Sequence, residues 1–318
     1  MRSRTFWKML LLATLLLAGC GGTGSPRSAD APLQVVATTG MVADLVKAVG
    51  GSRVTVKALM GPGVDPHLYK PTRNDMQLLT TADLIVFNGL HLEGRMVETL
   101  ERLETSRRPV VELGAALARD RLRHPPESTD HFDPHVWMDV ELWSQGITSV
   151  QQALCEQAPQ FAEEFRQRAE AHRLELRKLD ERVRTTIATI PAPQRLLVTS
   201  HDAFGYFGQA YGLEVHSVLG VTTDSEAAVS DINSLVDLVV QRRLPAVFIE
   251  SSVNQKSLQA LVEGAAARGV KVRLAGPLYS DALGPADSSA ATYIGMLETN
   301  ARLMAEALTA EASVTKEK

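Results

Sequence analysis

The sequence predicts an α/β protein with two lobes, whose four-stranded parallel sheets are joined by one long, rigid backbone helix. Three observations support this fold class. One apolar stripe at helical spacing extends from Pro159 to Ile190, strand-like runs alternate with helix-like runs before it, and the same alternation returns after it. The 318 residues are 45% hydrophobic and 22% charged, which is ordinary for a globular protein of two domains.

The first residues are typical of an export signal. Three basic residues precede the apolar run Met9–Leu17, which is too short to span a bilayer. Leu17-Ala18-Gly19-Cys20 resembles a lipobox, so we predict a lipoprotein signal peptide over residues 1–19 and lipidation of Cys20. An ordinary secretory signal with an incidental cysteine is the alternative. Residues 20–32 are rich in Gly, Ser and Pro and are expected to form a flexible tether.

The charge of the exported chain excludes some function classes. Without residues 1–19, the chain has 30 Lys and Arg against 37 Asp and Glu, a net charge of −7. An acidic, exported protein is a poor candidate for binding nucleic acid, whereas cations are compatible ligands. Only Cys155 remains after Cys20, so no intramolecular disulfide is expected, and we predict a monomer.

Residues 33–155 are predicted to form the N-terminal lobe. Short β-branched runs alternate there with helical patterns, which favours a parallel sheet with right-handed crossovers. The expected strands are Leu33–Thr39, Val54–Met60, Asp83–Asn88 and Val110–Leu113. The expected helices are Met41–Val49, Asn74–Thr81 and Glu93–Leu103.

Residues 156–191 are predicted to contain the linking helix. Its apolar positions follow steps of three and four, with charged residues opposite. The stripe consists of Phe161, Phe165, Ala169, His172, Leu176, Leu179, Val183, Ile187 and Ile190. Pro159 suits a first helical turn and Pro191 ends the pattern. A coiled-coil arm is the alternative, but the stripe is not a sustained heptad and globular sequence flanks it on both sides.

Residues 192–312 are predicted to form the C-terminal lobe, with the same alternation. The expected strands are Arg195–Ser200, Leu213–Leu219, Ala246–Glu250 and Val270–Ala275. The expected helices are Ala203–Tyr211, Val229–Arg242, Gln255–Arg268 and Ala290–Leu308.

Four metal-ligating side chains follow strands of the two predicted sheets. His67 and His135 follow the second and fourth strands of the first lobe, each in an Asp-Pro-His tripeptide. His201 and Asp281 follow the first and fourth strands of the second. Open α/β sheets bind ligands beyond the carboxyl ends of their strands, so we expect these groups to converge between the lobes. Imidazole and carboxylate together suit zinc, manganese or iron.

Other residues near strand ends allow more than one interpretation. Glu250 ends a strand and is a candidate acceptor for the second N–H of a ligating histidine, or less favourably a fifth ligand. His91 also follows a strand end and is expected near the cleft, although a structural role is favoured. Taken singly, each histidine is more often solvated or hydrogen-bonded than bound to a metal, and Asp281 alone suits a helix cap.

At these residues the chain resembles the TroA-like zinc and manganese solute-binding lipoproteins of ABC transporters, the cluster A-I periplasmic metal-binding proteins. The matching segments cover nearly all of the exported chain in order: Gly63–His67, Asn88–Glu93, Asp133–Trp137, Thr199–Phe207, Phe248–Ser252 and Leu278–Asp281. The resemblance implies two (β/α)₄ lobes on a rigid helix. It also implies one metal ion held by His67, His135, His201 and Asp281, and delivery of that ion to a membrane permease driven by an ATPase. The protein would be lipid-anchored at the outer face of the cytoplasmic membrane or in the periplasm.

The choice of metal rests on two departures from the family pattern. The loop Gly114–Phe132 is short and holds only His124 and His131, unlike the long His-rich loop of many zinc-dedicated members. His201 stands where many manganese-dedicated members have Glu, but the set of three His and one Asp resembles that of members described for both metals, and a bidentate Asp281 would make manganese workable. We favour manganese, with zinc also bound, over zinc alone.

Two other classes of protein fit the sequence less well. A metallohydrolase is disfavoured because four protein ligands close the metal shell and no His-Glu-x-x-His run is present. No phosphate-binding loop or nucleophile elbow appears either, so we do not expect an enzyme. A metal-binding surface adhesin, with a role in cell adhesion, remains the less favoured alternative.

Overall fold

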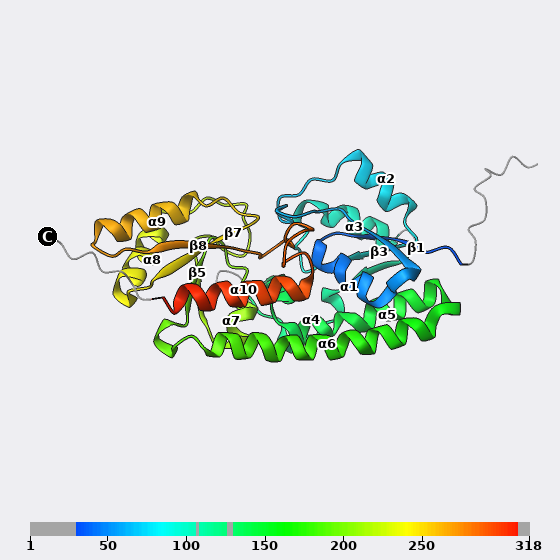
Figure 1. Cartoon of the computed structure of the whole chain (residues 1–318). Coiled ribbons are helices and arrows are strands. Elements are labelled where there is room, and N and C mark those ends of the chain that lie inside the picture. Colours follow the sequence, from blue (N-terminus) through cyan, green and yellow to red (C-terminus); the bar gives the residue numbers. More distant parts are fainter. Residues whose placement is uncertain (1–29, 106–107, 126–129, 311–318) are drawn as a thin grey trace, which may run out of the picture. The chain divides into compact units, whose positions relative to one another are not determined.

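The computed structural model describes residues 30–105, 108–125 and 130–310. It contains two four-stranded sheets, in the orders β2-β1-β3-β4 and β6-β5-β7-β8, and every pairing is parallel (Figure 1). The strands are β1 Leu33–Ala37, β2 Val54–Ala58, β3 Leu84–Phe87, β4 Val110–Glu112, β5 Leu196–Thr199, β6 Glu214–Ser217, β7 Ala246–Glu250 and β8 Arg273–Leu278. The predicted α/β fold class is confirmed. The predicted signal peptide, Cys20 and most of the tether lie outside the described residues.

Helices flank both sheets and connect their parallel strands. They are α1 Gly40–Gly50, α2 Arg73–Thr81, α3 Val97–Thr105, α4 Val140–Ser144, α5 Gly146–Gln157, α6 Ala162–Ala188, α7 Gly205–Tyr211, α8 Val229–Arg242, α9 Lys256–Ala267 and α10 Tyr293–Leu308. Local capping fixes several of their starts. The hydroxyl of Thr39 accepts the N–H of Val42 at the start of α1, and Thr72 forms a capping box with Asp75 at the start of α2.

The central strands of the two sheets are the most apolar. All four residues of β3, and all four of β5, are buried, as expected where helices cover both faces of a parallel sheet. The edge strand β2 instead alternates between half-buried and exposed residues. Seven of the eight described strands lie within their predicted ranges, and the carboxyl ends of the strands lead into the loops described below.

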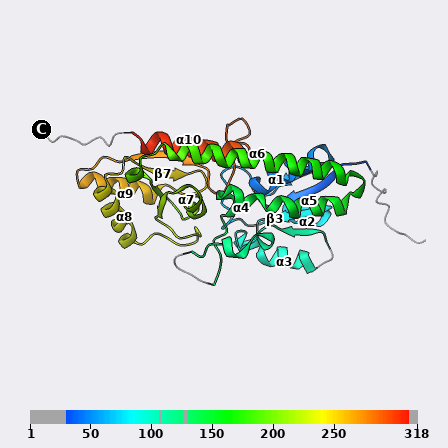
Figure 2. The ribbon, with the colours of Figure 1, turned by 90° about the horizontal axis from the view of Figure 1, so that it is seen from below.

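The long helix is confirmed, with a different start. Seven residues of its predicted stripe are buried in α6, from Phe165 to Ile187, and they include His172. Pro159 begins a separate 3₁₀ turn, Pro159–Phe161, because the backbone of Phe161 is not helical and the α-helix starts only at Ala162. Figures 1 and 2 show α6 running past both sheets, with α10 beside it, and α6 contacts α1, α4, α5, α7 and α10.

Three parts of the fold differ from the prediction. The helix predicted at Glu93–Leu103 is α3, which begins only at Val97, after the 3₁₀ turn Gly94–Met96. Helices α4 and α5 were not predicted: α4 has only five residues, and α5 was overlooked although Ile147, Val150 and Leu154 recur at helical spacing. Strand β8 begins and ends three residues later than predicted. β8 contains Pro277 and lies at the edge of its sheet, where a proline is tolerated.

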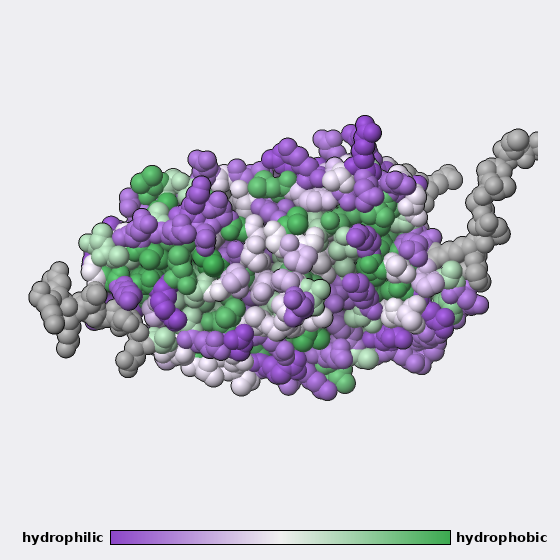
Figure 3. Space-filling view, turned by 45° about the horizontal axis from the view of Figure 1, so that its top comes forward, coloured by the Kyte–Doolittle hydropathy of each residue, from purple (hydrophilic) through white to green (hydrophobic). Residues whose placement is uncertain are grey.

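The described surface is mixed in polarity. Figure 3 shows apolar residues in separate patches among hydrophilic ones on the face that it presents. Within the described ranges, none of the helices has the length and apolar character needed to cross a membrane.

Candidate metal centre

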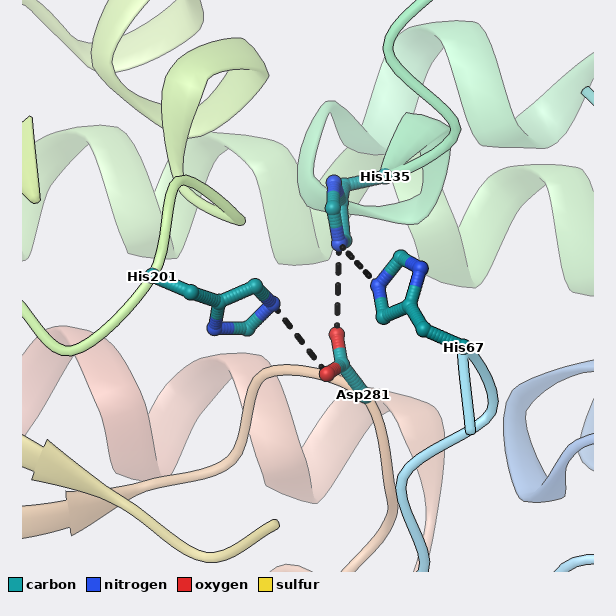
Figure 4. A group of neighbouring side chains, drawn as sticks. All are labelled: His67, His135, His201 and Asp281. Atoms are coloured by element: carbon teal, nitrogen blue, oxygen red, sulfur yellow. Dashed lines mark hydrogen bonds and ion pairs between the residues drawn. The ribbon is translucent and has the colours of Figure 1, made fainter. Parts of the chain in front are cut away.

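Four buried side chains from separate loops meet between the two sheets (Figure 4). His67 lies in the loop between β2 and α2, and His135 directly precedes the 3₁₀ turn Val136–Met138. His201 lies two residues beyond β5, and Asp281 three beyond β8. One ligand atom from each lies within 4.8 Å of the others, and the four residues are at most 3% exposed. The predicted convergence of these four side chains is therefore observed.

The spacing of these atoms suits a metal ion. Nε2 of His135 lies 3.3 Å from Nε2 of His67 and 3.4 Å from Oδ1 of Asp281. Nε2 of His201 lies 3.2 Å from Oδ2 of Asp281. Ligands about 2.0–2.2 Å from a tetrahedral metal are separated by about 3.3–3.6 Å, which is close to these distances. The two oxygens of Asp281 approach different histidines, so this carboxylate is able to offer either one or both of them.

Two atoms at the centre lack a hydrogen bond of good geometry. Nε2 of His201 and Oδ1 of Asp281 are buried and have no hydrogen-bond partner among the described residues. Their nearest contacts are the ion-pair distances given above, in which the atoms are poorly aligned. Buried polar atoms are normally satisfied, and a cation between them would satisfy both. The donor set therefore fits a divalent transition metal.

Carboxylates behind two of the histidines orient their rings. Oδ1 of Asp133 lies 2.8 Å from Nδ1 of His135 and also accepts its backbone N–H at 3.0 Å. Oε2 of Glu250 lies 2.7 Å from Nδ1 of His201, although off the direction of an aligned hydrogen bond. Oε1 of Glu250 accepts the backbone N–H groups of Ser200 and His201, at 2.8 and 2.9 Å. A carboxylate at Nδ1 favours the tautomer whose Nε2 lone pair faces the centre.

The ionisation of the cluster follows from burial and from these carboxylates. Burial lowers the pKa of His67 to about 3. Burial also disfavours the charged form of His135, but the hydrogen bond to Asp133 and the nearby carboxylate of Asp281 outweigh it and raise its pKa to about 9. Burial is likewise outweighed at His201, where the charges of Asp281 and Glu250 hold the pKa well above its usual value. Burial opposes ionisation of Asp281, yet His201 and His135 hold its pKa well below the usual range.

These shifts describe a centre that holds two positive charges in the absence of metal. Protonated His135 and His201 lie among three buried carboxylates, those of Asp133, Glu250 and Asp281. One divalent cation carries the same charge and requires the same two imidazoles to be neutral. Exchange of two protons for one M²⁺ therefore leaves the charge of the buried cluster unchanged, which limits the electrostatic cost of binding.

A buried network in the N-terminal lobe fixes the segment that carries His135. Glu93 accepts hydrogen bonds from the Thr38 hydroxyl at 2.7 Å and from the backbone N–H groups of Asn88 and Gly89, at 2.8 and 3.1 Å. The side chain of Asn88 donates to the carbonyl of Pro134 at 3.0 Å. Burial raises the pKa of Glu93. These roles of Asn88 and Glu93 were not predicted, although the two residues are the first and last of a segment that carries the family resemblance.

Other hydrogen bonds hold the two sheets together beside the centre. The indole N–H of Trp137 donates to the carbonyl of Ser280 at 2.8 Å, and the hydroxyl of Tyr293 donates to the carbonyl of Trp137 at 2.7 Å. The hydroxyl of Tyr206 donates to the carbonyl of Asp133 at 3.0 Å. The loops that carry His135 and Asp281 are thereby placed at a defined separation.

The remaining histidines lie outside the cluster. The rings of His91 and His131 are exposed and 4.6 Å apart between centroids, and both line a surface pocket of about 230 Å³ that His67 also borders. His91 is thus near the centre, as expected, without belonging to it. His172 is buried on α6, His124 is exposed, and His216 is half-buried on the edge strand β6 beside Glu214.

Comparison with known proteins identifies the family. The model of the family described as "ZnuA: Zinc-uptake complex component A periplasmic" matches residues 35–307. The chain belongs to the ZnuA family. The resemblance stated from the sequence motifs is thereby confirmed.

Individual relatives of this ZnuA-family chain are named for different metals. The manganese-binding lipoprotein MntA of Bacillus subtilis is 42% identical over 299 residues, which cover 94% of this chain and 97% of the relative. The zinc-binding protein TroA of Treponema pallidum is 46% identical over 281 residues, covering 88% and 90%. The solved structure of periplasmic TroA from T. pallidum has a TM-score of 0.84 at 45% identity, covering 87% of this chain and 99% of TroA. Fe(III)-bound YtgA of Chlamydia trachomatis has a TM-score of 0.76 at 28% identity, covering 89% and 100%.

Proposed function

We propose that this chain is the extracytoplasmic substrate-binding protein of a metal ABC transporter, and that it captures one manganese or zinc ion between its lobes. The observation that carries the proposal is the buried meeting of three imidazoles and one carboxylate at metal-ligand spacing, with two ligands from each lobe. The names of MntA and TroA support the binding of manganese or zinc.

In this proposal His67, His135, His201 and Asp281 are the ligands. Nε2 of each histidine faces the ion, Asp133 accepts from Nδ1 of His135, and the carboxylate of Glu250 lies 2.7 Å from Nδ1 of His201. Glu250 is therefore a partner of His201 and not a fifth ligand. The division into lobes at 33–155 and 192–312, joined by 156–191, stays a prediction.

The proposed cargo is manganese, with zinc also bound. Zinc binds nitrogen and oxygen donors more tightly than manganese in general. Manganese accepts a coordination number above four, and Asp281 is able to supply a second oxygen without displacing a histidine. Relatives named for either metal are 42% and 46% identical to this chain, so their names favour neither ion strongly.

Delivery of the ion requires a permease and its ATPase, which we propose as the partners of this protein. Lipidation at Cys20 would hold the chain at the outer face of the cytoplasmic membrane or in the periplasm, and we propose that it acts as a monomer. Transport without catalysis is consistent with four protein ligands, because a catalytic metal usually keeps a position open for water or substrate.

Titration of the metal-stripped protein tests the proposed function. Mn²⁺ and Zn²⁺ are added separately in a calorimeter, and the untreated protein is analysed for its metal content. We expect one equivalent of either ion to bind tightly, and His67→Ala to weaken binding strongly. His216→Ala is the matched control, because His216 pairs with Glu214 at 2.9 Å on an edge strand away from the centre. Failure of the unsubstituted protein to bind stoichiometric metal would overturn the proposal.

A further inference from the structure

Of the three converging histidines, His67 has the weakest support around its ring. His135 and His201 each have a carboxylate beside Nδ1, at 2.8 and 2.7 Å. In the described part of the chain, no carboxylate lies within ion-pair distance of the ring of His67. Its side chain also borders the surface pocket near His91. The position of His67 therefore depends on what holds its backbone.

Asp65 holds that backbone and also reaches the opposite lobe. Oδ1 of Asp65 accepts the N–H of His67 at 2.9 Å, as Oδ1 of Asp133 does for His135 in the other Asp-Pro-His tripeptide. The two aspartates differ in their remaining contacts. Oδ1 of Asp133 also contacts the ring of its histidine, whereas Oδ2 of Asp65 accepts the hydroxyl of Thr223 at 2.5 Å.

Thr223 belongs to the lobe that carries His201 and Asp281. It lies in the loop between β6 and α8 and is separated from Asp65 by 158 residues. A short hydrogen bond to a carboxylate is among the stronger polar contacts in proteins. The path from the Thr223 hydroxyl through Asp65 to the N–H of His67 thus crosses from one lobe to the other and ends at a proposed ligand.

We propose that Thr223 is a positioning residue that holds His67 in its metal-binding place whenever the two lobes are together. This inference rests on the proposed function. Separation of the loops breaks the Thr223–Asp65 hydrogen bond and frees the segment of His67, while His135 and His201 keep the carboxylates of their own lobes. Release of the ion therefore begins at His67, and the Thr223 hydroxyl slows that step.

A neighbouring contact provides a matched control. Nη2 of Arg95 and Oδ1 of Asp224 lie 3.3 Å apart, and this pair also joins the two lobes one residue beyond Thr223. Both side chains are about half exposed, at 46% and 57%, and neither contacts Asp65 or His67 in any described interaction. Exposed ion pairs contribute little to stability, so loss of this pair should not change the rate at which the metal is released.

The experiment measures the rate at which the zinc-loaded protein loses Zn²⁺ to an excess of a chromogenic chelator. Thr223→Val removes the hydroxyl with little change of shape. We expect release about tenfold faster or more, the size of change that follows loss of a hydrogen bond to a charged group. Thr223→Ser should restore slow release, and Asp224→Asn should release Zn²⁺ at the rate of the unsubstituted protein.

The rise in melting temperature on Zn²⁺ binding separates positioning from a purely structural role. Thr223→Val should lower the melting temperature of the metal-free protein, because Asp65 loses a partner, and it should also show a smaller rise with Zn²⁺ than Asp224→Asn. A purely structural role would leave that rise unchanged. Equal release rates in these two variants, or a Thr223→Ser protein as fast as Thr223→Val, would overturn the role of Thr223 alone. A lack of Zn²⁺ binding by the unsubstituted protein would overturn the proposed function and this inference with it.

Discussion

Oδ1 of Asp133 lies 2.8 Å from Nδ1 of His135, two residues later in the chain, and accepts the backbone N–H of the same residue at 3.0 Å. A single oxygen thereby fixes both the backbone and the ring of His135. The intervening Pro134 restricts the backbone of the turn, so the aspartate is held beside the imidazole by local geometry. The Asp-Pro-His tripeptide is a compact means of presenting Nε2 toward an ion.

Substitution of this aspartate tests that role. In Asp133→Asn the amide oxygen is able to keep both contacts, but it carries no negative charge and therefore no longer raises the basicity of the ligating imidazole. We expect affinity for Zn²⁺ to fall about 10- to 100-fold, as for other carboxylates behind a ligating histidine. Asp139→Asn is the control, because Asp139 caps α4 through the N–H of Leu142 and does not contact the cluster. Calorimetry should show normal affinity for the control, and equal losses in the two variants would contradict this role.

Metal binding should release protons. The carboxylates raise the pKa of His135 to about 9 and hold that of His201 well above its usual value, so both are protonated at pH 7 without metal. His67, with a pKa lowered to about 3 by burial, has no proton to lose. Because ligating imidazoles must be neutral, about two protons should leave per ion bound at pH 7.

The same reasoning gives the sign of the pH dependence. Affinity should rise as pH increases from 6 toward 9, because protons compete less with the ion, and it should level off only when the histidines are neutral without metal. Calorimetry in buffers of different ionisation enthalpy counts the released protons at each pH. An affinity that stops rising near pH 6.5, with no proton release at pH 7, would show that the carboxylates do not raise these pKa values.

The metal-free protein should lose stability in the alkaline range. The folded state raises the pKa of His135 to about 9, above the ordinary value of 6.5. Its contribution to the free energy of unfolding is therefore complete below pH 6.5 and is lost as pH rises through about 9. Chemical unfolding of the metal-free protein between pH 6 and 9.5 measures this loss. His135→Asn should unfold with a smaller pH dependence, and an identical dependence in both proteins would refute the prediction.

Much of the fold was predictable because the apolar residues of the long helix recur at a helical period, whereas the strands are short continuous runs of β-branched and apolar residues. The bounds of α8 and β7 agree with those predicted, since each is a clear pattern between turn signals. Helix α5 was overlooked although Ile147, Val150 and Leu154 stand at helical spacing, whereas α4 was missed because its five residues are too few to show a helical period. Tertiary packing, not local preference, decides such short segments.

The site was predictable to a similar degree. The four converging side chains follow strand ends, and strand ends are visible in the sequence. Their supporting contacts are not. The hydrogen bond between Thr223 and Asp65 joins residues 158 positions apart, and no local pattern indicates it. The role of Asp133 was easier to predict from the sequence, because both histidines of the repeated Asp-Pro-His tripeptide follow an aspartate by two residues.

The long helix offers a test of how its stripe stabilises the fold. Leu179 is fully buried on α6, whereas Leu174, five residues earlier on the same helix, is 47% exposed. Leu179→Ala removes buried methyl groups and leaves a cavity, so we expect the free energy of unfolding to fall by about 2–5 kcal/mol. Leu174→Ala is the matched control and should change it by at most about 0.5 kcal/mol. Urea unfolding of the metal-free proteins measures both values, and similar losses in the two variants would mean that the stripe does not face the core.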